Sequence, residues 1–356
     1  MIYFPKLDSL RFIAFFLVFW SHNFVSCFDR WKHDSWRIFL NPFFETGING
    51  VHIFFVISGF LITHLLIHEH REQQGINIKN FYLRRILRIW PLYYLIMILG
   101  LFVLPNLTSV FEFCGSYWMN LTFLNNFNII ENNNCFSTHV VIAWSVAIEE
   151  QFYLFWPIAF SLFYKKDRLI LFCFIVLIAS IILNPHFLYF STICNLNYLM
   201  TGCIGALFFD KYREVILASF ITQRRWLFAI VVLTCTTMLY TENYASSNTI
   251  SLILLPVFYL YFVLYTVVNN DGKKSYLSFL GKYTYGMYFY HPIIAVLVRI
   301  VFDKIGIPYL GYPLNFALAS VIALIITVVV SILSYQYFEG YFLRLKKKFS
   351  TVSTRI

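Results

Sequence analysis

An arginine and a histidine interrupt the otherwise apolar stretch LDSLRFIAFFLVFWSHNF at residues 7–24. Arg11 and His22 are eleven residues apart, so an α-helix would place both side chains on one face, roughly 16 Å apart along its axis. Histidine is the usual general base near neutral pH, and arginine binds anions. The pair therefore predicts a catalytic face. In the alternative, Arg11 only snorkels to the inner membrane surface and His22 lies among the headgroups.

A cluster of three arginines lies in the stretch FYLRRILRIWPLYY. Arg84 and Arg88 would share one helix face, whereas Arg85 would point about 100° away. Guanidinium groups bind phosphate bidentately, so the cluster predicts an anion site. The alternative is the ordinary basic collar of a membrane helix. Pro91 follows, and we expect it to break the helix and to open irregular backbone onto a cavity.

Two adjacent carboxylates, Glu149 and Glu150, lie in the apolar stretch WSVAIEEQFYLFWP. Neighbouring side chains on a helix diverge by about 100°, so at most one carboxylate is expected to face a given partner. A buried carboxylate also needs a cation or an imidazole nearby. In the alternative, the carboxylates lie in water at headgroup level. His291 ends the tyrosine-rich stretch YTYGMYFYHPI and is interpreted as a residue of the aromatic belt at the membrane surface.

These residues need a scaffold inside a membrane to position them. Hydrophobic residues make up 60% of the chain and charged residues only 12%, whereas soluble domains carry about 25% charged residues. The predicted fold class is an all-α integral membrane protein. Apolar runs long enough to cross the bilayer predict about ten transmembrane helices, near residues 9–27, 47–67, 86–104, 145–164, 168–184, 187–209, 226–242, 249–268, 279–301 and 313–336.

The basic residues predict the orientation of the helices. If both the N- and C-termini are cytoplasmic, the only Lys and Arg residues expected outside are Arg30, Lys32, Arg37, Arg299 and Lys304. This distribution follows the positive-inside rule. The net charge of +10 is then interpreted as contact with anionic membrane lipid, and no nucleic acid is expected as a partner. Residues 1–342 are expected to form one transmembrane domain, followed by a short basic cytoplasmic tail at 343–356.

The largest segment expected outside, residues 105–143, is rich in asparagine and could face a polar, sugar-like partner. Cys114 and Cys135 lie in this segment, and the sequence is equally compatible with a disulfide bridge and with two free thiols. No cysteine spacing predicts a metal site, and no glycine-rich phosphate loop supports ATP or NAD chemistry.

Five stretches in this order resemble the motifs of acyltransferase family 3, the bacterial integral-membrane O-acyltransferases of surface carbohydrates: LDSLRFIAFFLVFWSHN, GVHIFFVISGFLI, FYLRRILRIWPLYY, WSVAIEEQFYL and GKYTYGMYFYHPI. The resemblance covers about residues 7–295. It implies transfer of an acyl group, most often acetyl, from cytoplasmic acetyl-CoA to a hydroxyl of a cell-envelope or surface polysaccharide such as O-antigen or exopolysaccharide. It also implies a multi-pass protein of the bacterial inner membrane, with an acceptor that can be lipid-linked and without a metal.

The resemblance implies catalytic roles for His22, Arg11 and Glu149, and donor binding by Arg85 and Arg88; the fork argument adds Arg84. A thioester is already activated, so a histidine base could suffice without a serine or cysteine nucleophile. Direct transfer and an acyl-histidine intermediate both stay open. The rival interpretation is a transporter or flippase for a lipid-linked saccharide, since ionisable residues inside membranes also mark translocation paths.

Overall fold

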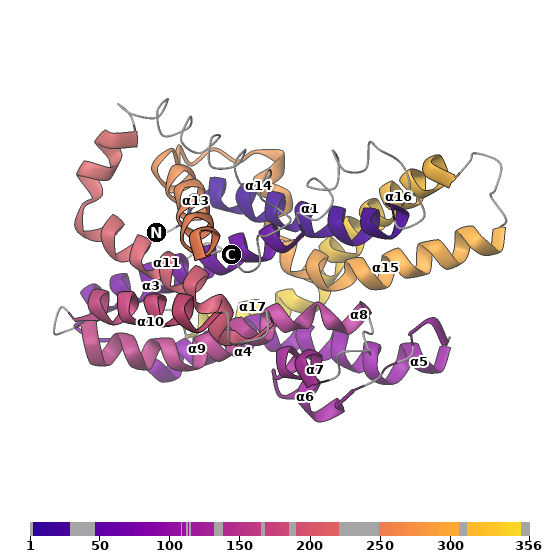
Figure 1. Cartoon of the computed structure of the whole chain (residues 1–356), viewed down its shortest axis with the longest axis horizontal. Helices are drawn as coiled ribbons and strands as arrows, with labels where there is room; N and C mark the ends of the chain where they lie inside the picture. The colour runs from indigo at the N-terminus through magenta and orange to yellow at the C-terminus, as the bar shows by residue number, and fades with distance from the viewer. Residues whose placement is uncertain are drawn as a thin grey trace.

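The structure, a computed structural model, consists of helices, and no strand occurs in the residues it describes, which are 3–28, 47–107, 109–111, 113, 115–131, 138–164, 168–184, 190–220, 249–305 and 312–349. Figure 1 shows long helices packed along one another, with the short helices α5, α6 and α7 grouped beside them. The long helices are α1 (Pro5–Phe28), α3 (Gly47–Gln73), α4 (Ile78–Ile98), α9 (Ala143–Phe163), α10 (Leu169–Leu183), α11 (Thr192–Lys211), α13 (Thr249–Val268), α15 (Thr284–Ile305) and α16 (Tyr312–Ser334). The shorter ones are α5 (Leu104–Leu107), α6 (Tyr117–Leu121), α7 (Asn125–Glu131), α8 (Thr138–Val141), α14 (Tyr276–Gly281) and α17 (Gly340–Lys347).

Several helical stretches are long and apolar enough to cross a membrane, so the chain is a multi-pass membrane protein. Six qualify among the described residues: Gly47–Gln73, Ile78–Leu107, Thr192–Lys211, Ser251–Val268, Thr284–Ile305 and Ala317–Lys347. Helices α1 and α9 have 24 and 21 residues, which is also enough to span, but they carry charged side chains. The all-helical class is confirmed, whereas the number of crossings and the orientation stay predictions. The expected span at 226–242, together with Cys114 and Cys135, lies outside the described residues.

Helix α4 continues through Pro91 without a break, so the prediction of a broken helix at this proline is wrong. Neighbouring helices and local adjustments commonly accommodate proline within membrane helices. The irregular turn comes later, at a short π-helix, η2 (Leu99–Val103), that joins α4 to α5. The N-terminus of α4 is capped by Asn77, whose side chain accepts a hydrogen bond from the Asn80 N–H at 3.0 Å.

Helices α3 and α11 pack backbone against backbone through two glycines. A Cβ atom added at Gly59 would overlap the carbonyl oxygen of Leu199, and one added at Gly202 would overlap the carbonyl oxygen of Val56. Small residues are what allow membrane helices to approach this closely, because lipid tails supply no hydrophobic force between helices. This contact holds α3, which contributes one wall of the site, in a fixed position.

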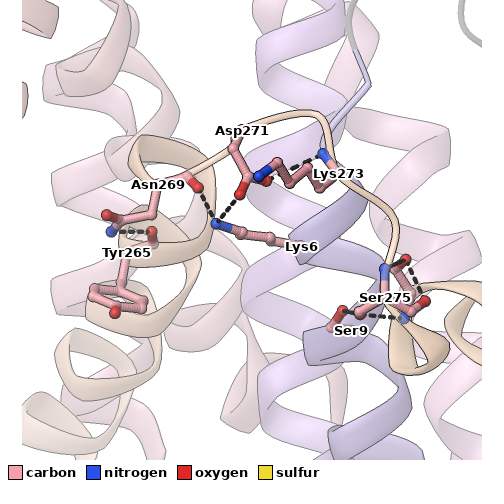
Figure 2. A network of polar contacts seen from close by, with 8 residues as sticks. Lys6, Ser9, Tyr265, Asn269, Asp271, Lys273 and Ser275 are labelled. Carbon is pink, nitrogen blue, oxygen red and sulfur yellow. Dashed lines mark hydrogen bonds and ion pairs between the residues drawn. The ribbon is translucent and has the colours of Figure 1, made fainter.

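The start of α1 is tied to the connection between α13 and α14 (Figure 2). The Lys6 ammonium group donates to the carbonyl oxygen of Asn269 and forms an ion pair with Asp271 at 3.2 Å. One turn later, the hydroxyl groups of Ser9 and Ser275 lie 3.1 Å apart. These contacts fix the start of α1, the end that is predicted to face the cytoplasm. They thereby also fix the positions of the α1 residues that follow.

The asparagines of the 105–143 segment are mostly used within the fold. Asn120, Asn125, Asn126 and Asn128 are buried. For example, Asn125 donates to the side-chain oxygen of Asn120 at 2.7 Å and accepts from the hydroxyl of Tyr93 at 2.7 Å. These four asparagines are therefore used within the fold, and that the segment faces a sugar-like partner stays a prediction. Their amide groups satisfy polar groups of α4, α9, α11 and the start of α6.

A second π-helical turn, η7 (Tyr335–Glu339), joins α16 to α17. Helix α17 carries basic residues, but it also packs against α4 and buries Leu343 and Lys346. The guanidinium group of Arg84 donates to the carbonyl oxygen of Phe349 at 3.0 Å. The expected boundary between residues 342 and 343 thus falls inside a packed helix.

Candidate active site

A cavity of about 160 Å³ lies between α1, α3, α4, α9 and the start of α15. Apolar side chains of α3 form much of its wall. The polar lining brings together side chains that are far apart in the sequence: Arg11, Ser58, Arg85, Arg88, Glu149, Tyr153, Lys282, Tyr285 and Tyr288. The cavity therefore gathers residues from all five motifs, including several that the sequence analysis did not single out.

Glu149 is the carboxylate that faces this cavity. It accepts hydrogen bonds from the hydroxyl of Ser58 at 2.6 Å and from the hydroxyl of Tyr153 at 3.3 Å. Glu150 points elsewhere and accepts from the indole N–H of Trp90 at 3.0 Å. The prediction that the two adjacent carboxylates diverge is confirmed, because only Glu149 lines the cavity.

Arg11 reaches the same cavity from α1 and is oriented by its own helix. Its guanidinium donates to the carboxylate of Asp8, three residues earlier, at 2.7 Å. Asp8 is buried, and this bond leaves the rest of the guanidinium free to face the cavity. An ion pair at spacing i,i+3 is local, so the sequence alone contains this pairing.

The arginine cluster divides between two tasks. Arg85 and Arg88 line the cavity, and the Arg85 guanidinium lies over the rings of Phe81 at 5.6 Å and Tyr153 at 5.7 Å. Within the part of the chain that the structure describes, Arg88 has no hydrogen-bond or ion-pair partner.

Arg84, in contrast, is buried in an ion pair with Glu69 of α3, at 2.5 Å, and is absent from the cavity lining. The structure thus pairs Arg85 with Arg88 at the cavity and gives Arg84 a contact between helices. Arg84 and Arg88 were predicted to share a helix face, but this does not determine which arginines line the cavity. Arg84 instead forms an ion pair with Glu69 on another helix.

The cavity has an excess of positive charge. Of the residues that the structure describes, four cationic side chains line it, from Arg11, Arg85, Arg88 and Lys282, against the single carboxylate of Glu149. Partial burial, reinforced by the nearby charge of Lys274, lowers the pKa of Lys282 below its ordinary value. Low-dielectric walls concentrate the field of such a group of charges, so an anionic ligand is favoured here.

His22 lies outside this cavity, at the other end of α1, where it pairs with His291. The Nδ1 atom of His22 lies 2.9 Å from the Nε2 atom of His291, and the two rings are within 9° of parallel. His291 is completely buried, so its interpretation as an aromatic-belt residue is wrong. The tyrosines of its motif gave no sign of the partner, because His22 is 269 residues away in the chain.

The hydrogen bonds assign the tautomers of both rings. His291 Nδ1 lies 3.1 Å from the carbonyl oxygen of Met287, which can only accept, so this nitrogen carries the proton. The Nε2 atom of His291 is then the acceptor, and His22 donates its Nδ1–H. The remaining nitrogen of this exposed side chain, His22 Nε2, has no hydrogen-bond partner among the described residues and can accept a proton.

Tyr288 lies between the cavity and the histidine pair. Its side chain lines the cavity, and its ring centroid is 5.9 Å from that of His291. Its hydroxyl donates to the carbonyl oxygen of Ile142 at 3.0 Å and lies 2.8 Å from the hydroxyl of Ser145, which holds the ring in place. The cationic cavity and the histidine pair are therefore separate features that share one wall.

Sequence reasoning missed several cavity residues: Ser58, Tyr153, Lys282, Tyr285 and Tyr288. Signals existed for some of them. Ser58 is a hydroxyl in the middle of an apolar motif, and Tyr153 is four residues after Glu149, one turn along the same helix. Lys282 gave no such signal, because nothing local distinguishes a lysine that lines a cavity.

Comparison of the sequence with known proteins identifies the family to which the chain belongs. A family model described as an acyltransferase domain matches residues 4–336. The O-acetyltransferase OatA of Staphylococcus aureus is 26% identical over 377 aligned positions, covering 95% of this chain and 57% of that protein. The peptidoglycan O-acetyltransferase OatA of Listeria monocytogenes is 31% identical over 180 positions, covering 46% of this chain and 25% of that protein.

A protein of Haemophilus influenzae is 28% identical over 248 positions, covering 62% of this chain and 98% of that protein. The chain thus spans about half, or less, of the length of the two named O-acetyltransferases. No solved structure matches it. Since the family model extends over nearly all of the described helices, the chain belongs to the family defined by this acyltransferase domain, as its five motifs indicated.

Proposed function

We propose that the protein is a membrane O-acyltransferase of the bacterial inner membrane, which moves an acyl group, by preference acetyl, from cytoplasmic acyl-CoA to a hydroxyl of a cell-envelope saccharide. The observation that carries the proposal is the cavity in which Arg11, Arg85, Arg88 and Lys282 surround Glu149. The matched relatives are named O-acetyltransferases, and one is named for peptidoglycan. O-antigen, exopolysaccharide and peptidoglycan are thus the acceptor classes to test first.

In this proposal, the arginines of α4 bind the phosphate groups of acyl-CoA. Arg88 has no hydrogen-bond or ion-pair partner among the described residues, so all of its donors are available. The Arg85 guanidinium lies over two aromatic rings and lines the cavity. Guanidinium groups match phosphate oxygens bidentately. Glu149 offsets part of the positive charge of the cavity, and Ser58 and Tyr153 fix its position.

His22 acts as the general base on the acceptor hydroxyl. No described residue bonds to its Nε2 atom, and its Nδ1–H is held by His291, which keeps the ring in the tautomer that can accept a proton. In a direct transfer, the hydroxyl oxygen forms a bond to the thioester carbonyl carbon, and the carbon–sulfur bond breaks. The hydroxyl proton passes to His22 and then to the departing CoA thiolate.

The flexible pantetheine arm of acyl-CoA would have to carry the acyl group from the cationic cavity past Tyr288 toward His22. Arg11 and His22 are eleven residues apart on α1, which corresponds to roughly 16 Å along the helix. Because Tyr288 lines the cationic cavity and also lies beside His291, the path past Tyr288 is a short route from the cavity to the histidine pair.

The experiment that tests the proposal supplies labelled acetyl-CoA and an envelope saccharide fraction to the purified protein in lipid nanodiscs. We expect label in the saccharide with the wild type, and a loss of about 10²–10⁴-fold in kcat with His22→Gln, because glutamine cannot cycle a proton. His139→Gln is the matched control, since His139 is buried against Gly100 and Phe111 in another part of the fold. Transfer by His22→Gln within a few-fold of wild type would show that His22 is structural. Movement of unlabelled saccharide across the membrane, with no acyl transfer, would favour the flippase alternative instead.

A further inference from the structure

A second cavity, of about 270 Å³, lies where α14, η7 and α17 meet. Its polar lining consists of Lys282, Tyr283, Tyr335, Gln336, Arg344 and Lys347. Lys282 also lines the cavity that contains Arg85 and Arg88, so the two cavities adjoin at this lysine. The α17 residues in the lining are Gly340, Leu343, Arg344 and Lys347, and this spacing is that of one helix face.

The charges around the second cavity are uncompensated. Among the described residues, its lining includes three cations and no carboxylate. In the described ranges, no hydrogen bond or ion pair links Lys282, Arg344 or Lys347 to an acidic side chain. The ammonium group of Lys282 lies over the Tyr335 ring, 4.5 Å from its centroid, and Tyr335 and Tyr283 form an edge-to-face pair at 5.1 Å. Cations and aromatic rings together form a surface suited to a phosphorylated nucleotide.

We propose that this second cavity binds the nucleotide end of acyl-CoA, with Arg344 and Lys347 on its 3′-phosphate. The inference rests on the proposed function, and it adds the position of the other end of the donor. The phosphopantetheine arm would then pass Lys282 into the first cavity and bring the acyl group toward Tyr288.

The basic residues at the end of α17 differ from an ordinary basic collar, because only some of them line the second cavity. Arg344, Lys347 and Lys348, which directly follows α17, are all exposed, but only Arg344 and Lys347 line the cavity. A collar that only binds anionic lipid would use Arg344, Lys347 and Lys348 alike. Lys348 therefore provides a matched control on the same helix with the same kind of charge.

The experiment measures the binding of CoA and of 3′-dephospho-CoA to the full chain in nanodiscs. For the wild type, we expect 3′-dephospho-CoA to bind about tenfold more weakly, the effect of losing one charge-assisted hydrogen bond. Arg344→Gln and Lys347→Gln should each reduce this ratio toward one by weakening CoA alone. Lys348→Gln should keep the wild-type ratio. The measurements are made in nanodiscs of zwitterionic lipid and repeated with anionic lipid, and the ratios should not depend on the lipid.

Equal binding of the two ligands by the wild type would overturn the nucleotide site while leaving the proposed donor in place. If the preference for CoA over 3′-dephospho-CoA were the same in the wild type and all three variants, the nucleotide site would also be overturned. A loss that appears only with anionic lipid, and affects both ligands alike, would assign these cations to the lipid surface and would also overturn the site. A wild type that binds neither ligand would overturn the proposed function and, with it, this inference.

Discussion

Arg88 and Arg84 lie one helical turn apart, yet their surroundings predict opposite responses to the same substitution. Arg88→Lys keeps the charge but loses the bidentate guanidinium, so we expect the KM for acetyl-CoA to rise about tenfold with little change in kcat. Steady-state kinetics on purified protein measure this. The control is Arg84→Lys, which should lower thermal stability through its buried Glu69 contact and leave KM unchanged. An unaltered KM in both Arg85→Lys and Arg88→Lys would mean that these residues form only a basic collar.

His291 is expected to act on His22 as a positioning residue, and two substitutions separate that role from packing. Glutamine can place a carbonyl oxygen near the position of His291 Nε2 and accept from His22 Nδ1–H, whereas leucine cannot. We therefore expect His291→Gln to stay within a few-fold of wild type. His291→Leu should lose about tenfold or more in kcat, with an unchanged KM for acetyl-CoA. Equal losses of kcat in the two variants would contradict the orienting role.

At the scale of the helices, the close contact of α3 and α11 should be sensitive to a single methyl group. Gly202→Ala forces a Cβ atom into the carbonyl oxygen of Val56, which a rigid backbone cannot avoid. Overpacking of this kind costs typically about 1–3 kcal/mol, and a lower thermal midpoint in detergent would reveal it. Gly75→Ala is the control, because a Cβ atom there meets nothing within 4 Å. The two variants having equal thermal midpoints would exclude a tight contact.

The anchor of α1 at Asp271 gives a pH dependence whose sign follows from its hydrogen bonds. The Lys273 backbone N–H, and also the Lys6 side chain, hold the pKa of the Asp271 carboxyl below its ordinary value of 3.8. A lowered pKa means that the ionised form is favoured in the folded state, so its contribution to stability is present above pH 3.8 and disappears as the pH falls further. We expect the small difference in thermal midpoint between wild type and Asp271→Asn to shrink toward zero in acid. A difference that is constant with pH would rule out this contribution.

For the whole molecule, the positive-inside rule predicts which connections face the cytoplasm. Reporter fusions near residue 125 should report the outside, and fusions near residues 166 and 272 the cytoplasm. The second of these cytoplasmic positions lies in the connection that holds Lys6 in Figure 2. Cytoplasmic signal at residue 125 would reverse the predicted orientation and separate the cationic cavity from cytoplasmic acyl-CoA.

What the sequence predicted depended on how local each feature was. Apolar runs and helix geometry were enough for the all-helical class and for the divergence of Glu149 and Glu150. The partners of Arg84 and His291 lie on other helices, so no local pattern contained them. The same holds for the second cavity, because Arg344 and Lys347 were predicted to belong to a short basic tail, and only the packing of α17 places them at a cavity.

The π-helical turn η7 sets the direction in which α17 presents its side chains. Such a turn contains one residue more than the equivalent α-helical turn, and one residue corresponds to about 100° of rotation. Removing a single residue between Tyr335 and Glu339 would keep α17 continuous with α16 but rotate every side chain after it. Arg344 and Lys347 would then turn away from Lys282 with no substitution in the cavity itself. The number of residues in this turn therefore determines where the charges of α17 lie. A comparison of residue identities alone would overlook this effect.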